Sequence, residues 1–209
     1  MTRIKIGVLG GTFDPIHLGH LIVAEDIREK LGLKEVLFIP AGQPWLKIKK
    51  EKQISTAEHR LAMVRLAVTP NPYFKVSTME IERTGLSYSI DTVLELKAKL
   101  GARAEIYFIV GPDALAQLHR WKEPARLVEL CQVVGIGRPG YARANLSKLE
   151  SSIPGASQRI MLVEVPKINI SSTDIRKRVA QGLSIRYLVP EEVEKYIHEH
   201  GLYVSPLAC

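Results

Sequence analysis

The sequence predicts an α/β fold in which a mainly parallel sheet is doubly wound and carries helices on both faces. Two observations support this prediction. Short apolar runs, typical of buried strands, alternate along the chain with segments of helical periodicity. No repeat or low-complexity segment interrupts this alternation. Because the chain has 209 residues with ordinary hydrophobic and charged fractions of 46% and 24%, we expect one domain over residues 1–209.

The first predicted elements are a strand, a glycine-rich loop and a helix. The run RIKIGVL, from Arg3 to Leu9, is typical of a buried strand, and the glycines after it allow a sharp turn. From Leu18 to Leu31 apolar residues recur at three- and four-residue spacing, and Gly32 lies where a helix stop is expected. The run EVLFIP, from Glu35 to Pro40, predicts a second strand, followed by a long exposed loop of mixed Gly, Pro and Lys.

The middle of the chain continues the same alternation. Ser55 and Glu58 form a capping-box pattern at the start of a helix that ends before Pro70. The run FKVSTMEI, from Phe74 to Ile81, predicts a strand, and helical spacing follows from Tyr88 to Leu100.

The last predicted elements complete a series of alternating strands and helices. Such a series requires a largely parallel, Rossmann-like sheet. The remaining strands are predicted at Ala104–Val110, Gln132–Ile136 and Ile160–Val165, and the remaining helices from about Ser172 and from Pro190.

Three polar loops follow strands of the predicted sheet, at residues 10–20, 111–113 and 170–176. In sheets of this kind ligands bind outside the carboxyl ends of the strands, where the loops into the helices gather. We therefore expect these loops to lie together at one edge.

Charge and cysteine content limit the classes of protein that this sequence fits. The formal net charge of +7 suits an anionic partner, although a solvated basic surface explains it equally well. Cys131 lies in an apolar stretch and Cys209 is the last residue, a pattern of neither a disulfide framework nor a metal quartet. The N-terminal apolar run is too short for a signal peptide, and no run reaches the 18 or so apolar residues of a membrane helix. We expect a cytoplasmic protein that does not associate with membranes.

The stretch GGTFDPIHLGH, from Gly10 to His20, places two histidines three residues apart at a helix start. Helical residues at this spacing share a face, so His17 and His20 are expected to project together beyond the helix N-terminus. The free N–H groups and the positive dipole end favour a phosphate there. Gly19 keeps the approach open, and Thr12 can donate a hydroxyl. The alternative, a capping His17 and an ordinary surface His20, is less favoured because of the surrounding GGTFDP.

The segment ISSTDIR predicts a second helix N-terminus, capped by Ser171 or Ser172. Arg176 follows one turn later. Two hydroxyls, free backbone N–H groups and a forked guanidinium together favour a polyphosphate, whereas SSTD alone indicates only an N-cap.

Other patterns are given smaller roles. A zinc site is disfavoured because the metalloprotease pattern needs histidines four apart with a glutamate between them. The run of lysines after residue 46 is typical of a solvated loop, and only Lys47 is a candidate for function. The match to GxGxxG at Gly135–Gly140 has Pro139 where a dinucleotide fingerprint enters its helix, so we interpret it as a turn with Arg138 near a ligand.

These motifs resemble those of the nucleotidylyltransferase superfamily, whose signatures are a (T/S)xxxxHxGH loop and a C-terminal (I/V)SST-x-(I/V)R segment. Both are present in full. The segments LSYSIDT, IVGPD and GRPGY, together with Trp121 and the ending from Tyr196 to Tyr203, are similar to the narrower family of bacterial nicotinate-nucleotide adenylyltransferases. The resemblance extends from Lys5 to Tyr203.

The resemblance implies transfer of AMP from ATP to nicotinate mononucleotide, with Mg²⁺ as cofactor, giving nicotinate adenine dinucleotide and pyrophosphate in NAD biosynthesis. The partners are then ATP and nicotinate mononucleotide, with neither nucleic acid nor membrane. The acceptor phosphate is already an anionic nucleophile, so positioning and charge stabilisation suffice without a general base. The sequence leaves the oligomeric state open, and a homo-oligomer is compatible with it.

The resemblance also implies roles for individual residues, and no residue is assigned to a protein-held metal site. Catalysis is assigned to His17, His20 and Arg176. ATP binding is assigned to Gly10, Gly11, Thr12, Phe13, His17, His20, Gly111, Asp113, Ser171, Ser172, Thr173 and Arg176. Binding of nicotinate mononucleotide is assigned to Asp14, Lys47, Tyr88, Ser89, Trp121, Lys122 and Arg138.

The sequence departs from the family pattern at two places. Many relatives have Pro-Pro-His-Lys where this chain has Pro44-Trp45-Leu46-Lys47, so only the lysine carries over. Many have Trp-Tyr where this chain has Trp121-Lys122, which affects the nicotinate pocket.

Three other function classes share features with this sequence. Phosphopantetheine adenylyltransferases share TFDPxxxGH but are usually shorter and lack SYSIDT and GRPG. Class I aminoacyl-tRNA synthetases share the HxGH pattern, but 209 residues leave no room for a tRNA-binding domain, and no KMSKS-like loop is visible. A basic nucleic-acid-binding protein is disfavoured because its aromatic residues, 6% of the chain, are not interleaved with the lysine run.

Overall fold

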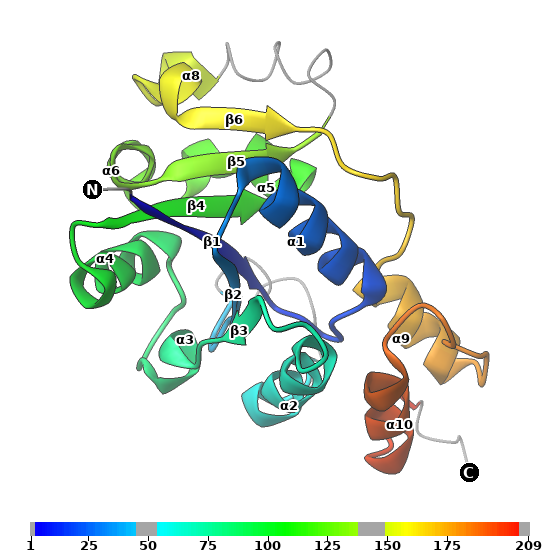
Figure 1. The fold of residues 1–209 in the computed structure, drawn as a ribbon. Helices are drawn as coiled ribbons and strands as arrows, with labels where there is room; N and C mark the ends of the chain where they lie inside the picture. The colour runs from blue at the N-terminus through cyan, green and yellow to red at the C-terminus, as the bar shows by residue number, and fades with distance from the viewer. Residues whose placement is uncertain (1–2, 45–53, 138–148, 205–209) are drawn as a thin grey trace.

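The computed structural model describes residues 3–44, 54–137 and 149–204. Within these ranges a parallel sheet has the strand order β3-β2-β1-β4-β5-β6 (Figure 1). This order, in which the chain builds outward from β1 first on one side and then on the other, is that of a doubly wound fold. The predicted fold class is confirmed. The strands are β1 (Ile4–Gly11), β2 (Glu35–Pro40), β3 (Phe74–Val76), β4 (Ala104–Val110), β5 (Gln132–Ile136) and β6 (Ile160–Val163).

Helices cover both faces of the sheet, as alternate residues of β4 show. Tyr107 and Ile109 pack into a core shared with α1, α2, α9 and α10, whereas Ile106 and Phe108 pack into a second core shared with α4, α6 and α8. Successive side chains of a strand point to opposite faces, so each face buries its own set. The helices are α1 (Leu18–Leu31), α2 (Ala57–Val68), α3 (Met79–Glu82), α4 (Ser89–Leu100), α5 (Pro112–Ala116), the 3₁₀ helix η1 (Leu118–Arg120), α6 (Pro124–Leu130), α8 (Ala156–Arg159), α9 (Ser172–Ala180) and α10 (Glu191–Glu199).

Several predicted elements have the observed boundaries. The helix α1 and the strands β2, β4 and β5 begin and end where the sequence places them, and Gly32 ends α1. The strand β1 extends to Gly11, so the first two glycines of the motif form the carboxyl end of this strand. The strand β6 ends at Val163, two residues before the predicted end at Val165.

The predicted strand from Phe74 to Ile81 is wrong in its second half. The strand β3 ends at Val76, and Met79–Glu82 form the short helix α3. The chain leaves the sheet at Thr78, whose carbonyl oxygen accepts hydrogen bonds from the backbone N–H groups of Ile81 and Glu82. The alternating pattern of FKVSTMEI resembles a strand, but local backbone bonds close a helical turn there.

The start of α2 is also corrected. The N-cap is Thr56, whose hydroxyl accepts from the backbone N–H of His59, and not Ser55. Ser55 belongs to the preceding loop, because its N–H donates to Asp14 Oδ2 at 3.3 Å.

The periodicity did not detect α5, η1 and α6, since these helices cover only 5, 3 and 7 residues. Residues 45–53 of the predicted long loop lie outside the described ranges. None of the helices that the structure describes combines the length and apolar character needed to cross a membrane.

Candidate active site

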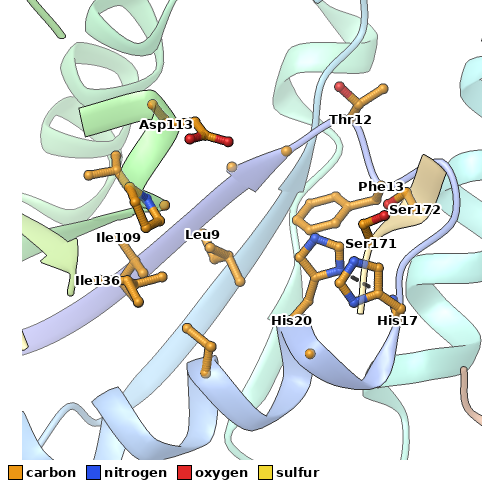
Figure 2. Close-up of a pocket in the computed structure, with 18 of the residues that line it drawn as sticks. Leu9, Thr12, Phe13, His17, His20, Ile109, Asp113, Ile136, Ser171 and Ser172 are labelled. Carbon is orange, nitrogen blue, oxygen red and sulfur yellow. Dashed lines mark hydrogen bonds between the residues drawn. The ribbon is translucent and has the colours of Figure 1, made fainter. Parts of the chain in front are cut away.

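A cavity of about 1400 Å³ opens at the carboxyl ends of β1 and β4, between α1 and the segment that leads from β6 to α9. Figure 2 shows the histidines of α1 on one side of it and Asp113, from α5, at the other end. Pockets for single small ligands have volumes of about 300–1000 Å³, so this cavity has room for more than one small molecule. The predicted gathering of polar loops at this edge is therefore present.

The structure brings nearly all predicted nucleotide residues into this cavity. Of the residues assigned to ATP, those lining it are Gly10, Gly11, Thr12, Phe13, His17, His20, Gly111, Asp113, Ser171, Ser172 and Thr173. Of the acceptor residues, Ser89 and Trp121 line it. Asp14, Tyr88, Lys122 and Arg176 lie outside its lining, and Lys47 and Arg138 lie outside the described residues.

The two histidines of the motif stack on each other at the start of α1. Their ring centroids are 3.7 Å apart with an interplanar angle of 26°, and the ring of Phe13 meets His20 edge-on at 5.1 Å. His17 is the N-cap residue, and its backbone N–H donates to Nδ1 of His20 at 3.2 Å. Because Nδ1 of His20 accepts, the ring proton is on Nε2. His20 is thus held with a hydrogen-bond donor on Nε2.

His17 is buried, with 7% of its surface exposed, and burial lowers its pKa to about 4. It is therefore uncharged at neutral pH. Its Nδ1 has no hydrogen-bond partner within the part of the chain that the structure describes. A buried polar atom without a partner is uncommon, and this one lies at the positive end of α1, where a phosphate oxygen would be favoured.

Gly19 is required by the close approach of the His17 ring. A Cβ atom at position 19 would lie 3.0 Å from Nδ1 and 3.1 Å from Cε1 of His17. Any larger residue would press the ring out of its place. This contact explains the glycine between the two histidines in physical terms.

The N-terminus of α9 closes the same side of the cavity. Ser171 is the N-cap, and its hydroxyl oxygen accepts from the backbone N–H of Asp174 at 3.1 Å. The hydroxyl of Ser172 donates to the backbone oxygen of Pro15 at 2.9 Å, which ties α9 to the loop before α1. These two side chains shape the helix end, which leaves Thr173 and the backbone N–H groups to meet an anion.

Arg176 supports the site from behind. Its Nη1 donates to the backbone oxygen of Asp14 at 2.7 Å, and the side chain does not line the cavity. Asp14 is almost fully buried, at 1% exposed, with its Oδ1 accepting from the Tyr203 hydroxyl at 2.7 Å. Both residues therefore act on the conformation of the loop between β1 and α1.

Arg60 is a residue of this region that the sequence prediction missed. It is 2% exposed, and Asp14 opposes the lowering of its pKa by burial. The signal was present in the sequence, because Arg60 precedes the buried residues Met63, Val64 and Ala67 at the helical spacing of three, four and seven. An arginine in the apolar stripe of a helix needs partners, and buried charges are paired.

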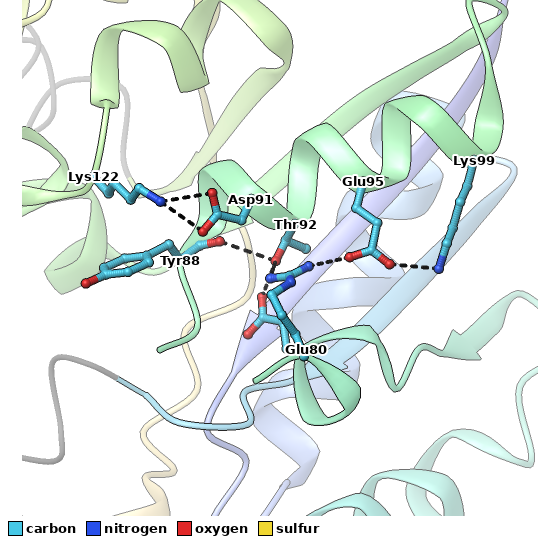
Figure 3. Close-up of polar contacts among 8 residues, drawn as sticks. Glu80, Tyr88, Asp91, Thr92, Glu95, Lys99 and Lys122 are labelled. Carbon is cyan, nitrogen blue, oxygen red and sulfur yellow. Dashed lines mark hydrogen bonds and ion pairs between the residues drawn. The ribbon is translucent and has the colours of Figure 1, made fainter. Parts of the chain in front are cut away.

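The part of the cavity to which the family resemblance assigns the acceptor holds Trp121, Ser89 and the buried carboxyl group of Glu80, which the sequence prediction also missed. The indole Nε1 of Trp121 is buried and unpartnered among the described residues. The ammonium of Lys122 lies 3.1 Å from both carboxylate oxygens of Asp91 and 4.8 Å from the centroid of the Tyr88 ring (Figure 3). Lys122 is therefore engaged by Asp91 at the cavity's outer edge.

Comparison with known proteins agrees with this geometry. The family model for cytidylyltransferase-like proteins matches residues 8–178. A protein of Roseiflexus sp., named probable nicotinate-nucleotide adenylyltransferase, is 50% identical over 203 residues, covering 97% of this chain and 100% of that protein. A Dehalococcoides mccartyi protein of the same name is 45% identical over 203 residues, covering 97% and 98%.

Solved structures show the same fold. The nicotinic acid mononucleotide adenylyltransferase of Plasmodium falciparum, complexed with NaAD, superposes with a TM-score of 0.75 at 21% identity, covering 96% of this chain and 98% of that one. The predicted motifs, the doubly wound sheet and the full-length relatives agree. The chain belongs to the nicotinate-nucleotide adenylyltransferases, within the cytidylyltransferase-like family.

Proposed function

We propose that this protein transfers AMP from ATP to nicotinate mononucleotide, giving nicotinate adenine dinucleotide and pyrophosphate, a step of NAD biosynthesis. The observation that carries the proposal is the stacked His17–His20 pair at the N-terminus of α1, facing a cavity with room for two nucleotides. The names of the relatives at 45% and 50% identity support the same activity.

The reaction needs positioning rather than a strong base. An oxygen of the acceptor phosphate attacks the α-phosphorus of ATP, and the bond to the bridging oxygen breaks as pyrophosphate leaves. Charge increases on the α-phosphoryl oxygens and on the leaving group, so hydrogen-bond donors aimed there lower the barrier. The ring N–H of His20 supplies such a donor, and the positive end of the α1 dipole favours the same charge.

The remaining ATP contacts follow from the cavity walls. We assign the β- and γ-phosphates to the N-terminus of α9, around Thr173, with the uncharged His17 as a further hydrogen-bonding group. Asp113 and Gly111, at the start of α5, are assigned to the adenosine, whose ribose hydroxyls a carboxylate can accept. Arg176 is assigned a supporting role, because its bond to Asp14 sets the loop that carries Thr12.

We also propose Mg²⁺ as the cofactor, bound mainly through ATP. The described residues contain no group of three or more His, Cys, Asp and Glu side chains arranged to hold a metal ion. Mg²⁺ commonly binds substrate phosphates and keeps several waters, so a hydroxyl oxygen such as that of Thr12 fits its needs. When bound, the ion neutralises phosphate charge.

The acceptor is assigned to the part of the cavity around Ser89 and Trp121. Ser89 begins α4, and the unbonded N–H groups of a helix start suit the carboxylate of nicotinate. An amide would turn its own NH₂ group toward some of these donors. Loss of a charge-assisted hydrogen bond costs about 1.5–3 kcal/mol, so the acid is expected to be preferred at least about tenfold in kcat/KM.

The test is pyrophosphate release from ATP and Mg²⁺ with nicotinate mononucleotide, nicotinamide mononucleotide and phosphopantetheine as separate acceptors. We expect turnover to be fastest with the first. Turnover with phosphopantetheine alone would refute the proposal in favour of the related adenylyltransferase.

His20→Ala is expected to lower kcat by roughly a hundredfold, the usual cost of one donor to a transition-state charge. His198→Ala, at an exposed histidine of α10, is the matched control.

A further inference from the structure

The carboxyl group of Glu80 lies at the centre of a buried polar network beside the acceptor side of the cavity. Glu80 belongs to α3, is 7% exposed and lines the cavity together with Ser87 and Ser89. Burial raises its pKa, and hydrogen bonds from the side chains of Thr92 and Ser87 oppose that rise. A buried carboxylate is costly unless it is well hydrogen-bonded, so this one needs both contacts.

The direction of the bond between Thr92 and Glu80 follows from its neighbour Arg83. Nη1 of Arg83 donates to the Thr92 hydroxyl oxygen at 3.2 Å, because a guanidinium can only donate. The Thr92 hydroxyl donates to Glu80 Oε1 at 2.7 Å, and the backbone oxygen of Tyr88, at 3.4 Å, is its more distant second acceptor (Figure 3). Glu80 accepts at this oxygen.

The bond from Ser87 has the same direction. The Ser87 hydroxyl oxygen accepts from the backbone N–H groups of Gly42 at 3.0 Å and Gln43 at 3.3 Å. The Ser87 hydroxyl, whose oxygen already accepts these two bonds, also favours the ionised form of Glu80. An ionised carboxylate accepts with either oxygen, whereas a primary amide accepts at one oxygen and presents an NH₂ donor at the other position.

These bonds join two loops at the acceptor side. Thr92 and Ser87 bracket Tyr88 and Ser89 at the start of α4, and Ser87 also holds the chain after β2 through Gly42. The approach at Gly42 is close, because a Cβ atom there would overlap the backbone oxygen of Glu80.

We propose that Glu80 is a positioning residue for the acceptor: its ionised carboxylate fixes the start of α4, and the loop after β2, in the geometry that receives nicotinate mononucleotide. This proposal rests on the proposed function. It assigns Glu80 no contact with ATP, whose phosphates lie at α1 and α9. The loss of this carboxylate should therefore affect the two substrates unequally.

The experiment compares Glu80→Gln with the parent. The amide keeps the shape of the side chain but directs a donor at one of the two hydroxyls, breaking one bond. The loss of one hydrogen bond corresponds to about a fivefold effect, so we expect the KM for nicotinate mononucleotide to rise fivefold or more. The KM for ATP should stay within about twofold.

Two further variants make the result specific. Thr92→Val removes one donor to Glu80 without changing the side-chain shape, and it should raise the acceptor KM in the same way. Leu100→Ala is the matched control, because Leu100 is an exposed residue at the C-terminal end of α4, eight positions after Thr92. It should leave both KM values unchanged.

The outcomes are distinguishable. Absence of dinucleotide formation by the parent protein would refute the proposed function and this proposal with it. An active parent whose Glu80→Gln and Thr92→Val variants raise both KM values equally, or neither, would overturn the positioning role alone. Failure of both variants to fold would also overturn it, since the network would then serve the fold rather than the acceptor.

Discussion

Nη1 of Arg60 donates a hydrogen bond to the backbone oxygen of Thr12 at 2.9 Å. The same guanidinium donates from Nη2 to Gly42 at 3.1 Å and from Nε to Ser55 at 3.0 Å, each time to a backbone oxygen. One buried side chain therefore joins the loops after β1 and β2 to the start of α2. The loops after β1 and β2 are therefore both held by Arg60, in addition to the bonds from the Ala41 N–H to Gly11 and from the Ser55 N–H to Asp14.

Arg60→Lys is expected to destabilise the protein and to lower activity toward both substrates together. A lysine keeps a positive charge near Asp14, but one ammonium cannot reach three carbonyl oxygens that a planar fork reaches. A buried carbonyl left without a partner costs about 1–3 kcal/mol, so we expect a loss of roughly 2–4 kcal/mol of unfolding free energy. Urea denaturation measures it. Arg65→Lys, an exposed position of the same helix, should change nothing, and an equally stable Arg60→Lys variant would contradict the role.

Gly19→Ala is expected to separate activity from stability. Alanine favours a helix over glycine by about 1 kcal/mol, but its Cβ would meet the His17 ring at 3.0 Å. We expect kcat/KM for ATP to fall about tenfold, the effect of roughly 1.4 kcal/mol in transition-state binding, while the melting temperature changes little. Ile22→Ala, at an exposed residue of α1, is the control. Full activity of Gly19→Ala would show that the ring position is not critical.

The stability of the protein should fall in mild acid because of His17. Its pKa in the folded protein is about 4, below the value of 6.5 expected when unfolded. As the pH falls below 6.5 the unfolded chain takes up a proton that the folded one does not, so stability is lost until about pH 4. The shift corresponds to roughly 3 kcal/mol.

The control for this prediction is the His17→Gln variant, because a glutamine side chain does not titrate. The difference in unfolding free energy between the parent and this variant should decrease from pH 7 to pH 4. Parallel stability curves for the two proteins would mean that His17 does not titrate as described.

Lys122→Met is expected to leave the preference for nicotinate over nicotinamide mononucleotide within about twofold. The ammonium is already bound by Asp91 and the face of Tyr88, and it does not line the cavity. An exposed ion pair contributes less than about 1 kcal/mol, so the fold should tolerate its loss. Competition between the two mononucleotides at fixed ATP measures the preference. If the variant loses the preference for nicotinate mononucleotide, the Lys122 ammonium of the parent contacts the carboxylate of the acceptor.

The strands along the chain and the position of the histidine pair could be predicted because they depend on strong local patterns. The apolar runs of β2 and β4 and the periodic helix α1 need no tertiary information, and parallel connectivity brings their polar loops to one edge. By contrast, Phe74–Ile81 alternates like a strand, and only the contact geometry around Thr78 shows where the helix begins.

The supporting residues were missed for a different physical reason. Arg60 and Glu80 are charged, and a charged residue within an amphipathic segment is normally assigned to the solvent. Their burial depends on partners far along the chain: Arg60 meets Thr12, 48 residues away, and Glu80 meets Thr92, 12 residues away. The resemblance to a family places Arg176 beside the phosphates, which stays a prediction, and its contact with Asp14 is visible only in three dimensions.

The bond from Tyr203 to Asp14 joins residues 189 positions apart. A ribosome synthesises the β1 strand, the glycine turn and α1 early, and N-terminal parts of a chain begin to fold first. For most of translation the nascent protein thus contains the histidine pair but not yet Tyr203, whose hydroxyl bonds to Asp14 in the loop before the pair. The Tyr203–Asp14 bond can form only when Tyr203 has been added, so the loop gains this last contact late in synthesis, well after the sheet has begun to form.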